Sequence, residues 1–175
     1  MPSRTAHSSA YFKLAEHPTV LKTRRLKTGS KMSAHPQPLG HLSIGVHNYA
    51  ISKAFYGAVL EPLGLRLVYD SETAKPAGTA GPRTLGYGVD AEHELLNIFE
   101  HGELARPPGR GCHIAFNAAS RQAVVDFHAA ALRFGGVCDG RPGLRSHYGE
   151  NYFAAFVICP DGWRLEAVCK KREDD

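Results

Sequence analysis

Alternating apolar and polar residues predict two strands that begin alike. Residues 41–47, HLSIGVH, and residues 112–118, CHIAFNA, each place a histidine ahead of a β-like alternation. Each is followed by apolar residues at helical spacing, in residues 52–64 and 120–136. Further strands are predicted after each helix, at 65–70, 84–89 and 94–100 and then near 136–140, 152–159 and 163–169. The predicted order is therefore βαβββ, twice over.

The two halves also match in register. A shift of 72 residues carries His41 onto His113, Phe55 onto Phe127 and Gly64 onto Gly136 without a gap. Because the match respects both the strand and the helix period, we interpret it as an internal repeat. We expect an α+β domain over residues 37–170 with helices outside a mixed sheet. Its predicted parts are module one (38–100), a Pro- and Gly-rich linker (101–111) and module two (112–170).

The charge of the chain is uneven. The formal net charge is +4, but residues 1–31 hold seven basic residues against one acid, which leaves 14 basic and 16 acidic residues from position 32 onward. The body therefore has no charge pattern for nucleic acid or an anionic membrane. No apolar run approaches the roughly 18 residues of a membrane span. We expect residues 1–36 to be a disordered tail, or an extension of a chain that starts at Met32 rather than Met1, and residues 171–175 to be a charged tail.

The cysteines indicate a reducing compartment of the cell. Four cysteines lack CxxC spacing and no secretory signal accompanies them, so we expect reduced core thiols in a cytoplasmic protein. They are Cys112, Cys138, Cys159 and Cys169. The alternative location is an organelle, reached through the basic N-terminal segment. His128 falls on the second predicted helix, where we expect it to be exposed.

The closing stretch FAAFVICPDGWRLEAVC carries a family resemblance. An apolar strand, Pro-Asp-Gly and a strand with a central Glu166 resemble the last hairpin of the glyoxalase/bleomycin resistance/dioxygenase superfamily, also called vicinal oxygen chelate proteins. The resemblance spans roughly residues 38–170, and SHYGENYFAAF is similar to a glyoxalase-like branch of unassigned substrate. It implies two βαβββ units whose strands form a cupped mixed sheet around a cavity. It also implies that Glu166 is a metal ligand.

Three residues form the predicted metal site. His41 and His113 begin equivalent strands, and alternation along WRLEAVC places Glu166 on the face opposite Leu165 and Ala167. Two imidazoles and one carboxylate leave coordination positions open for a substrate. Fe(II), Mn(II), Zn(II) and Ni(II) all remain open. Each residue alone is more often a hydrogen-bonded or solvent-facing side chain, and it is the repeat together with the hairpin that favours a metal.

A fourth ligand is in doubt. The glyoxalase I pattern takes a second carboxylate from the last strand of the first unit. Matching residues 96–98 to residues 165–167 puts Asn97 there, whereas the ungapped shift puts Glu94 opposite Glu166. With Asn97, the site resembles the three-ligand sites of extradiol dioxygenases and fosfomycin-resistance thiol transferases.

The stretch LRSHYGENY supplies candidates for chemistry. His147 and Tyr148 are candidate catalytic residues, because an imidazole titrates near neutrality and serves as an acid or base. Arg145, Tyr152 and Asn97 are candidate substrate-binding residues, with Arg145 suited to a carboxylate or phosphonate. A polar loop at the mouth of a cavity is the alternative interpretation.

These observations leave three hypotheses. The first is a metalloenzyme that uses a divalent ion as a Lewis acid on a small molecule with two adjacent oxygens, in a lyase, isomerase, dioxygenase or thiol-transferase reaction. The second is a metal-free small-molecule binding protein of the bleomycin-resistance type. The third is a non-catalytic interaction module. A homodimer is expected, because sheets with free edges commonly pair.

Overall fold

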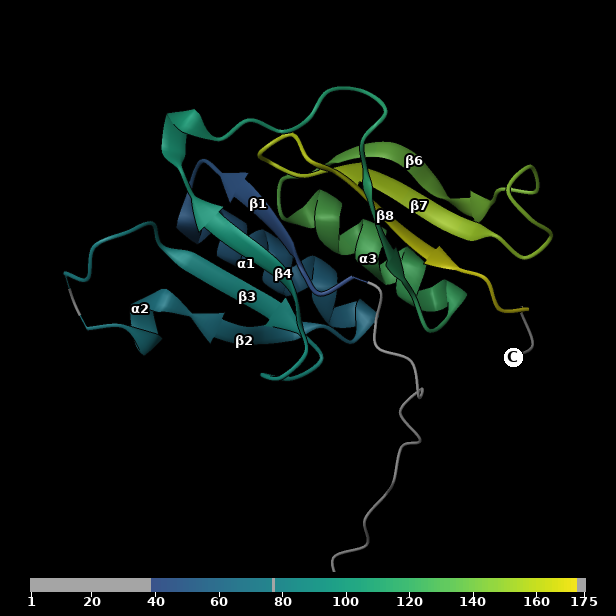
Figure 1. Cartoon of the computed structure of the whole chain (residues 1–175). Coiled ribbons are helices and arrows are strands. Elements are labelled where there is room, and N and C mark those ends of the chain that lie inside the picture. Colours follow the sequence, from purple (N-terminus) through teal and green to yellow (C-terminus); the bar gives the residue numbers. More distant parts are fainter. Residues whose placement is uncertain (1–38, 77, 173–175) are drawn as a thin grey trace, which may run out of the picture. The chain divides into compact units, whose positions relative to one another are not determined.

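The first half of the chain forms one mixed sheet with a helix. The computed structural model describes residues 39–76 and 78–172 (Figure 1). The sheet has the order β1-β4-β3-β2, with β1 parallel to β4 and the other pairs antiparallel. Its elements are β1 (Leu42–Val46), α1 (Tyr49–Leu60), η1 (Glu61–Leu63), β2 (Arg66–Asp70), α2 (Ser71–Ala74), β3 (Thr84–Gly88) and β4 (Glu94–Glu100).

The second half repeats this topology. Its sheet has the order β5-β8-β7-β6, again with the first pair parallel and the others antiparallel. The elements are β5 (Ile114–Asn117), α3 (Arg121–Arg133), β6 (Val137–Leu144), β7 (Phe153–Ile158) and β8 (Arg164–Cys169), after the short η2 (Gly102–Leu104). The predicted α+β class with two βαβββ modules is therefore confirmed.

Local side chains explain where the helices begin and end. The side-chain oxygen of Asn48 accepts the Ile51 N–H at the start of α1, and Ser120 accepts the Ala123 N–H at the start of α3. Gly64 follows η1 with a φ of 76°. That left-handed conformation favours glycine, so the chain turns into β2 there without strain.

Two elements differ from the expectation. β6 is longer than the predicted strand near 136–140, and its register with β7 shifts on either side of Gly140. Glycines and Pro142 obscure its alternation, and such a strand is tolerated at the sheet edge, where β6 lies. No helix was predicted at α2, which forms because the Asp70 carboxylate accepts the Glu72 N–H and caps one helical turn.

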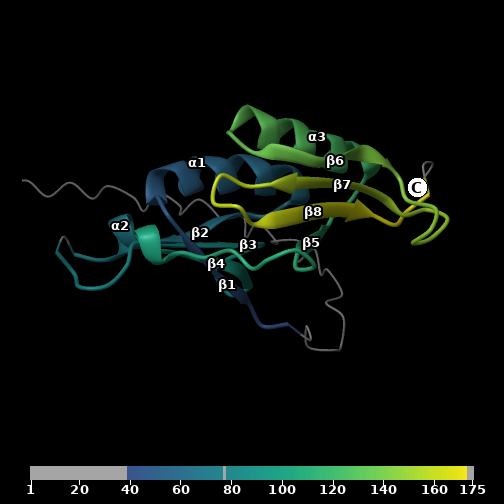
Figure 2. The ribbon, with the colours of Figure 1, turned by 90° about the horizontal axis from the view of Figure 1, so that it is seen from above.

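The two modules pack through their helices. In Figures 1 and 2, α1 and α3 lie side by side, and each covers one face of its own sheet. Their contact is apolar and fully buried, with Phe55, Tyr56 and Val59 from α1 and Val124, Phe127 and Ala131 from α3. Burial of this apolar surface is the main force that joins the modules.

A polar contact adds to that packing. Asp161, in the turn between β7 and β8, accepts the His47 N–H at 2.6 Å and the Ser52 hydroxyl at 3.1 Å. The indole Nε1 of Trp163 donates to the Gly45 carbonyl at 3.0 Å. The last hairpin of module two is thereby fixed to the β1–α1 connection of module one.

The predicted tail at 1–36 and residues 173–175 of the predicted C-terminal tail lie outside the described residues. Among the residues that are described, no helix is long and apolar enough to cross a membrane.

Candidate functional site

Glu166 lies on the face of the second sheet that α3 does not cover. Its neighbours along β8, Leu165 and Ala167, are fully buried on the α3 side. Glu166 pairs with Ala115 of β5 and with Phe156 of β7, so these three side chains share the opposite face. The alternation predicted for this strand is confirmed.

His113 approaches Glu166 from the start of the parallel strand. Its Nε2 atom lies 2.9 Å from Oε2 of Glu166, and the side chains are 48% and 2% exposed. Two ligands that bind one ion at about 2.1 Å and at right angles lie about 3 Å apart. An imidazole nitrogen and a carboxylate oxygen at this separation therefore fit a divalent cation in donor type and in spacing, but they supply only two ligands.

Tyr152 holds the other oxygen of the carboxylate. Its hydroxyl donates to Glu166 Oε1 at 2.6 Å. Burial, followed by the hydrogen bond and the charge of Glu166, raises the pKa of Tyr152 to about 12. The phenol is therefore a protonated donor at neutral pH, and it fixes the carboxylate so that Oε2 faces His113.

A guanidinium group lies beyond the imidazole. The rings of His113 and Phe156 meet edge to face at 6.2 Å, and Arg145 lies 5.6 Å above the Phe156 ring. Arg145 donates to the Arg141 carbonyl at 2.7 Å, and a Cβ atom added to Gly143 would lie 3.2 Å from its Nη1. Among the described residues it contacts no carboxylate. The group is thus held in place while its charge stays available to an anion.

A row of aromatic rings extends the site from Glu166 toward the loop that follows β6. The ring of Tyr148 lies 4.1 Å from the His147 ring and 5.3 Å from the Tyr152 ring. A surface hollow of about 320 Å³ is lined by residues 148–152 and by Lys170, whose Nζ lies 5.5 Å from the Tyr152 ring. The structure therefore brings together the predicted residues Arg145, His147, Tyr148 and Tyr152.

His41 and Asn97 belong to the first sheet. Across residues 39–76 and 78–172, no three His, Cys, Asp or Glu side chains gather closely enough to hold a metal ion. Within one chain, then, His41 does not join His113 and Glu166 as the pseudo-symmetry suggested. The reason is that each module has its own sheet and the two meet through α1 and α3.

Strand register decides which residue of module one corresponds to Glu166. Leu42 pairs with Leu96, and its repeat partner Ile114 pairs with Leu165. Asn97 is therefore equivalent to Glu166, as matching the strands predicted. The carboxylate of Glu94 nevertheless reaches across the sheet to the space above Gly86, where an added Cβ would lie 2.1 Å from its Oε2. Gly86 pairs with Asn97, so an acidic group does lie beside the Asn97 position.

Some residues were misjudged from the sequence. All four cysteines are free, but only Cys159 and Cys169 are buried, and the expectation of a core position is wrong for Cys112 and Cys138. His128 is 8% exposed, not exposed as expected, because its helix turns it toward β6. Phe156 was missed altogether. Its place in an apolar run indicated core packing. Only its pairing with Glu166 shows that it lies on the same face as the site, where its ring contacts His113 and Arg145.

Several solved structures share this fold. A glyoxalase/bleomycin resistance protein from Albidiferax ferrireducens T118 is 26% identical, with a TM-score of 0.54 over 75% of this chain and 97% of that one. A mutant fosfomycin resistance protein, FosX, from Listeria monocytogenes in complex with Mn(II) and 1S,2S-dihydroxypropylphosphonic acid is 15% identical, with a TM-score of 0.56 over 81% and 96%. A mutant glyoxalase I from Zea mays is 20% identical, with a TM-score of 0.59, but the match covers 77% of this chain and only 47% of that one.

No family model and no curated protein matches the sequence. The structural neighbours show that the chain has the fold of the glyoxalase/bleomycin resistance/dioxygenase proteins. These neighbours include a glyoxalase I, a fosfomycin resistance protein and a glyoxalase/bleomycin resistance protein. The comparisons therefore identify the fold, and the reaction has to be inferred from the site.

Proposed function

We propose that the protein is a glyoxalase-like metalloenzyme that acts on a small molecule with two adjacent oxygens. His113 and Glu166 would bind a divalent ion, which remains open among Fe(II), Mn(II), Zn(II) and Ni(II). The observation that carries the proposal is the 2.9 Å separation of His113 Nε2 and Glu166 Oε2, with Tyr152 on the other carboxylate oxygen. Metal ligands in proteins typically accept such a hydrogen bond from a neighbouring residue, or donate one to it, which fixes their orientation.

A second copy of the chain would supply His41. The side chain lies at the start of β1, is exposed, and makes no hydrogen bond or ion pair with another described residue. In a two-fold symmetric dimer, the uncovered face of the first sheet in one copy would meet that of the second sheet in the other, and symmetry would generate two equal centres. The proposed homodimer thus completes the three-ligand set that one chain leaves divided.

The bound ion would act as a Lewis acid that stabilises negative charge on the substrate oxygens. Tyr152 orients Glu166, and Arg145 is available to bind an anionic group of the substrate. Tyr148 lines the hollow and its ring lies 4.1 Å from that of His147, so these two residues are available to move a proton. Asn97 adds no charge, but the Glu94 carboxylate lies beside its position, so the anionic group of a substrate would bind on the Arg145 side of the centre. The outcome stays open among lyase, isomerase, dioxygenase and thiol-transferase reactions.

Metal content tests the proposal. We expect the purified protein to bind divalent metal and His113→Ala to bind well below one equivalent per chain, measured by elemental analysis after dialysis. His93→Ala is the matched control, since His93 lies on an exposed turn where its Nδ1 contacts Asp90 at 2.7 Å. Undiminished metal in His113→Ala would overturn the proposal.

The second candidate is a metal-free binding protein. One observation in its favour is that His113 already gives the buried Glu166 carboxylate a partner without a metal. Another is that the rings of Tyr148 and Tyr152 line the hollow. Persistent absence of metal, with no gain in melting temperature on adding divalent ions, would favour this binder. A cytoplasmic location is part of either proposal and is supported by the four free cysteines.

A further inference from the structure

A thiol and an imidazole lie in contact on the other side of the second sheet. Cys138 of β6 pairs with Val157, which is fully buried on the α3 side, so the Cys138 side chain points toward α3. There its Sγ atom lies 3.2 Å from Nε2 of His128. Phe156 and Glu166 occupy the opposite face, so this pair is separate from the candidate metal site and independent of the proposed function.

The environment of His128 keeps its imidazole neutral. Its side chain is 8% exposed, and among the described residues the thiol is its one hydrogen-bond partner. Burial lowers the pKa of His128, and the positive charge of Arg141 lowers it further. The ring is therefore neutral at physiological pH, and in the tautomer with its proton on Nδ1 the Nε2 lone pair accepts the thiol proton.

The other three cysteines lack this combination. Cys159 and Cys169 are 3% and 1% exposed, and burial raises the pKa of the Cys159 thiol, which disfavours its reactive thiolate. Cys112 is exposed, but among the described residues no imidazole forms a hydrogen bond with its thiol. Cys138 alone among the four is both exposed and hydrogen-bonded to an imidazole. Arg141, three residues along β6, places a positive charge nearby.

We propose that Cys138 is a thiol-modification site that reacts with small anionic disulfides such as oxidised glutathione. The Cys138 sulfur attacks one sulfur of the disulfide while its proton passes to His128 Nε2. A new sulfur–sulfur bond forms as the old one breaks, and the other half of the reagent leaves as a thiolate. A second small thiol reverses the step by the same exchange. Arg141 attracts the anionic reagent.

Disulfide exchange on the full chain tests this. With limiting 5,5′-dithiobis(2-nitrobenzoate), an anionic disulfide, we expect peptide mass spectrometry to find Cys138 modified about 10-fold faster than Cys112, because an adjacent base speeds the exposed thiol. Cys138→Ser should remove the fast phase, and Cys112→Ser should keep it. Mixed-disulfide formation with oxidised glutathione should follow the same order.

Two further variants separate chemistry from packing. His128→Asn should slow Cys138 about 10-fold while the rate at Cys112, measured in the same molecule, stays unchanged. Arg141→Gln leaves the thiol–imidazole contact intact and should slow the anionic reagent, but not neutral 4,4′-dithiodipyridine. Equal or faster reaction of Cys112 in the wild type, or an unchanged Cys138 rate in both variants, would overturn the proposal.

Discussion

Nε2 of His113 and Oε2 of Glu166 lie 2.9 Å apart, although the two residues come from different strands, β5 and β8. The parallel pairing of these strands sets Ala115 beside Glu166, and His113 precedes Ala115 by two residues on the same face. The contact is therefore a consequence of strand register. The repeat places His41 in the same relation to Asn97, so each module contributes an unequal half to the proposed centre.

Tyr152→Phe should weaken metal binding without unfolding the protein. The change removes only the hydroxyl that donates to Glu166 Oε1, and loss of such a supporting hydrogen bond typically costs about 10- to 100-fold in metal affinity. Competition against a fluorescent chelator measures the dissociation constant. Tyr148→Phe is the control, since that ring is 64% exposed and should leave the constant unchanged. Equal affinities for Tyr152→Phe and the wild type would refute the supporting role.

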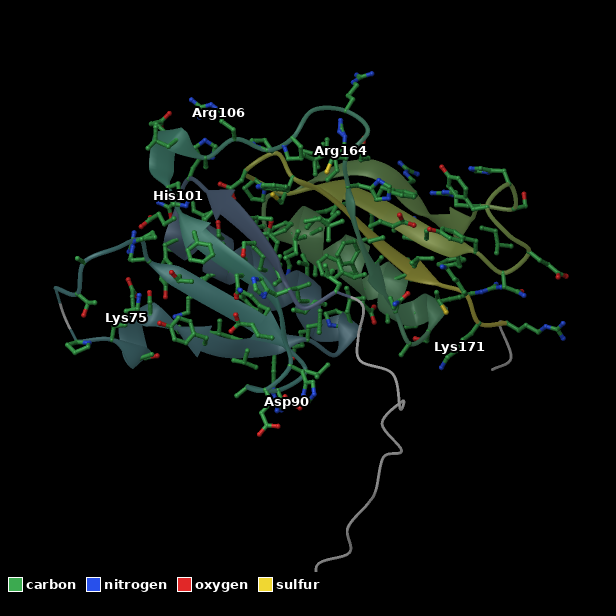
Figure 3. All side chains as sticks on the ribbon, viewed as in Figure 1. Lys75, Asp90, His101, Arg106, Arg164 and Lys171 are labelled. Carbon is green, nitrogen blue, oxygen red and sulfur yellow. The ribbon has the colours of Figure 1, made fainter. Side chains whose placement is uncertain are left out.

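Asp161→Asn should destabilise the whole domain. The Asp161 carboxylate is 5% exposed and accepts the His47 N–H and the Ser52 hydroxyl across the module boundary. An amide nitrogen in place of one oxygen would face a donor, so we expect a loss of about 2 kcal/mol in the free energy of unfolding. Urea denaturation measures it, with Asp139→Asn as the control because that carboxylate is 39% exposed and 3.7 Å from Arg164. Arg164, labelled in Figure 3, is the first residue of β8. A midpoint equal to that of the control would contradict this prediction.

Asp70→Asn should lose stability in a pH-dependent way. Burial alone would raise the pKa of Asp70, but hydrogen bonds from Lys53, Tyr49 and the Glu72 N–H outweigh it and lower the pKa below its ordinary value. Because the folded pKa lies below the unfolded one, the ionised carboxylate stabilises the fold above about pH 4, and this contribution disappears as the pH falls through the folded pKa.

The measurement is the difference in urea midpoint between the wild type and Asp70→Asn. We expect a clear difference at pH 7 that shrinks steadily below about pH 4. Asp126→Asn, on the exposed side of α3, should show little difference at either pH. A difference between wild type and Asp70→Asn that stays constant down to pH 3 would show that ionisation of Asp70 is not involved.

Local pattern predicted most of the fold. Strand alternation around Glu166, helical spacing around Phe55 and Phe127, and the repeat between them all reflect rules that act within a few residues. Only the first part of β6 was predicted, because Gly140 and Gly143 interrupt the alternation of apolar and polar residues in the rest of the strand. The same local rules matched Asn97 to Glu166, because register follows from the strand pattern.

Tertiary packing decided what the sequence did not predict. Whether His41 reaches His113 depends on which surfaces of the two modules meet, and residues on α1 and α3, far from either histidine, determine that. The burial of His128 and its contact with Cys138 likewise depend on how α3 lies on β6. The sequence around His41 and around His128 does not indicate which residue each histidine contacts.

The central claim is that each metal centre is shared between two copies of the chain. Complementation between two variants that each lack one metal-binding histidine tests this most directly. His41→Ala and His113→Ala should each bind almost no metal, since every centre needs one histidine from each copy. After equal amounts are co-refolded from urea, half of the dimers are mixed and each has one intact centre, so metal should return to about one quarter of the wild-type level per chain. Failure of the mixture to recover any metal, or retention of metal by either variant alone, would contradict a centre shared between two copies.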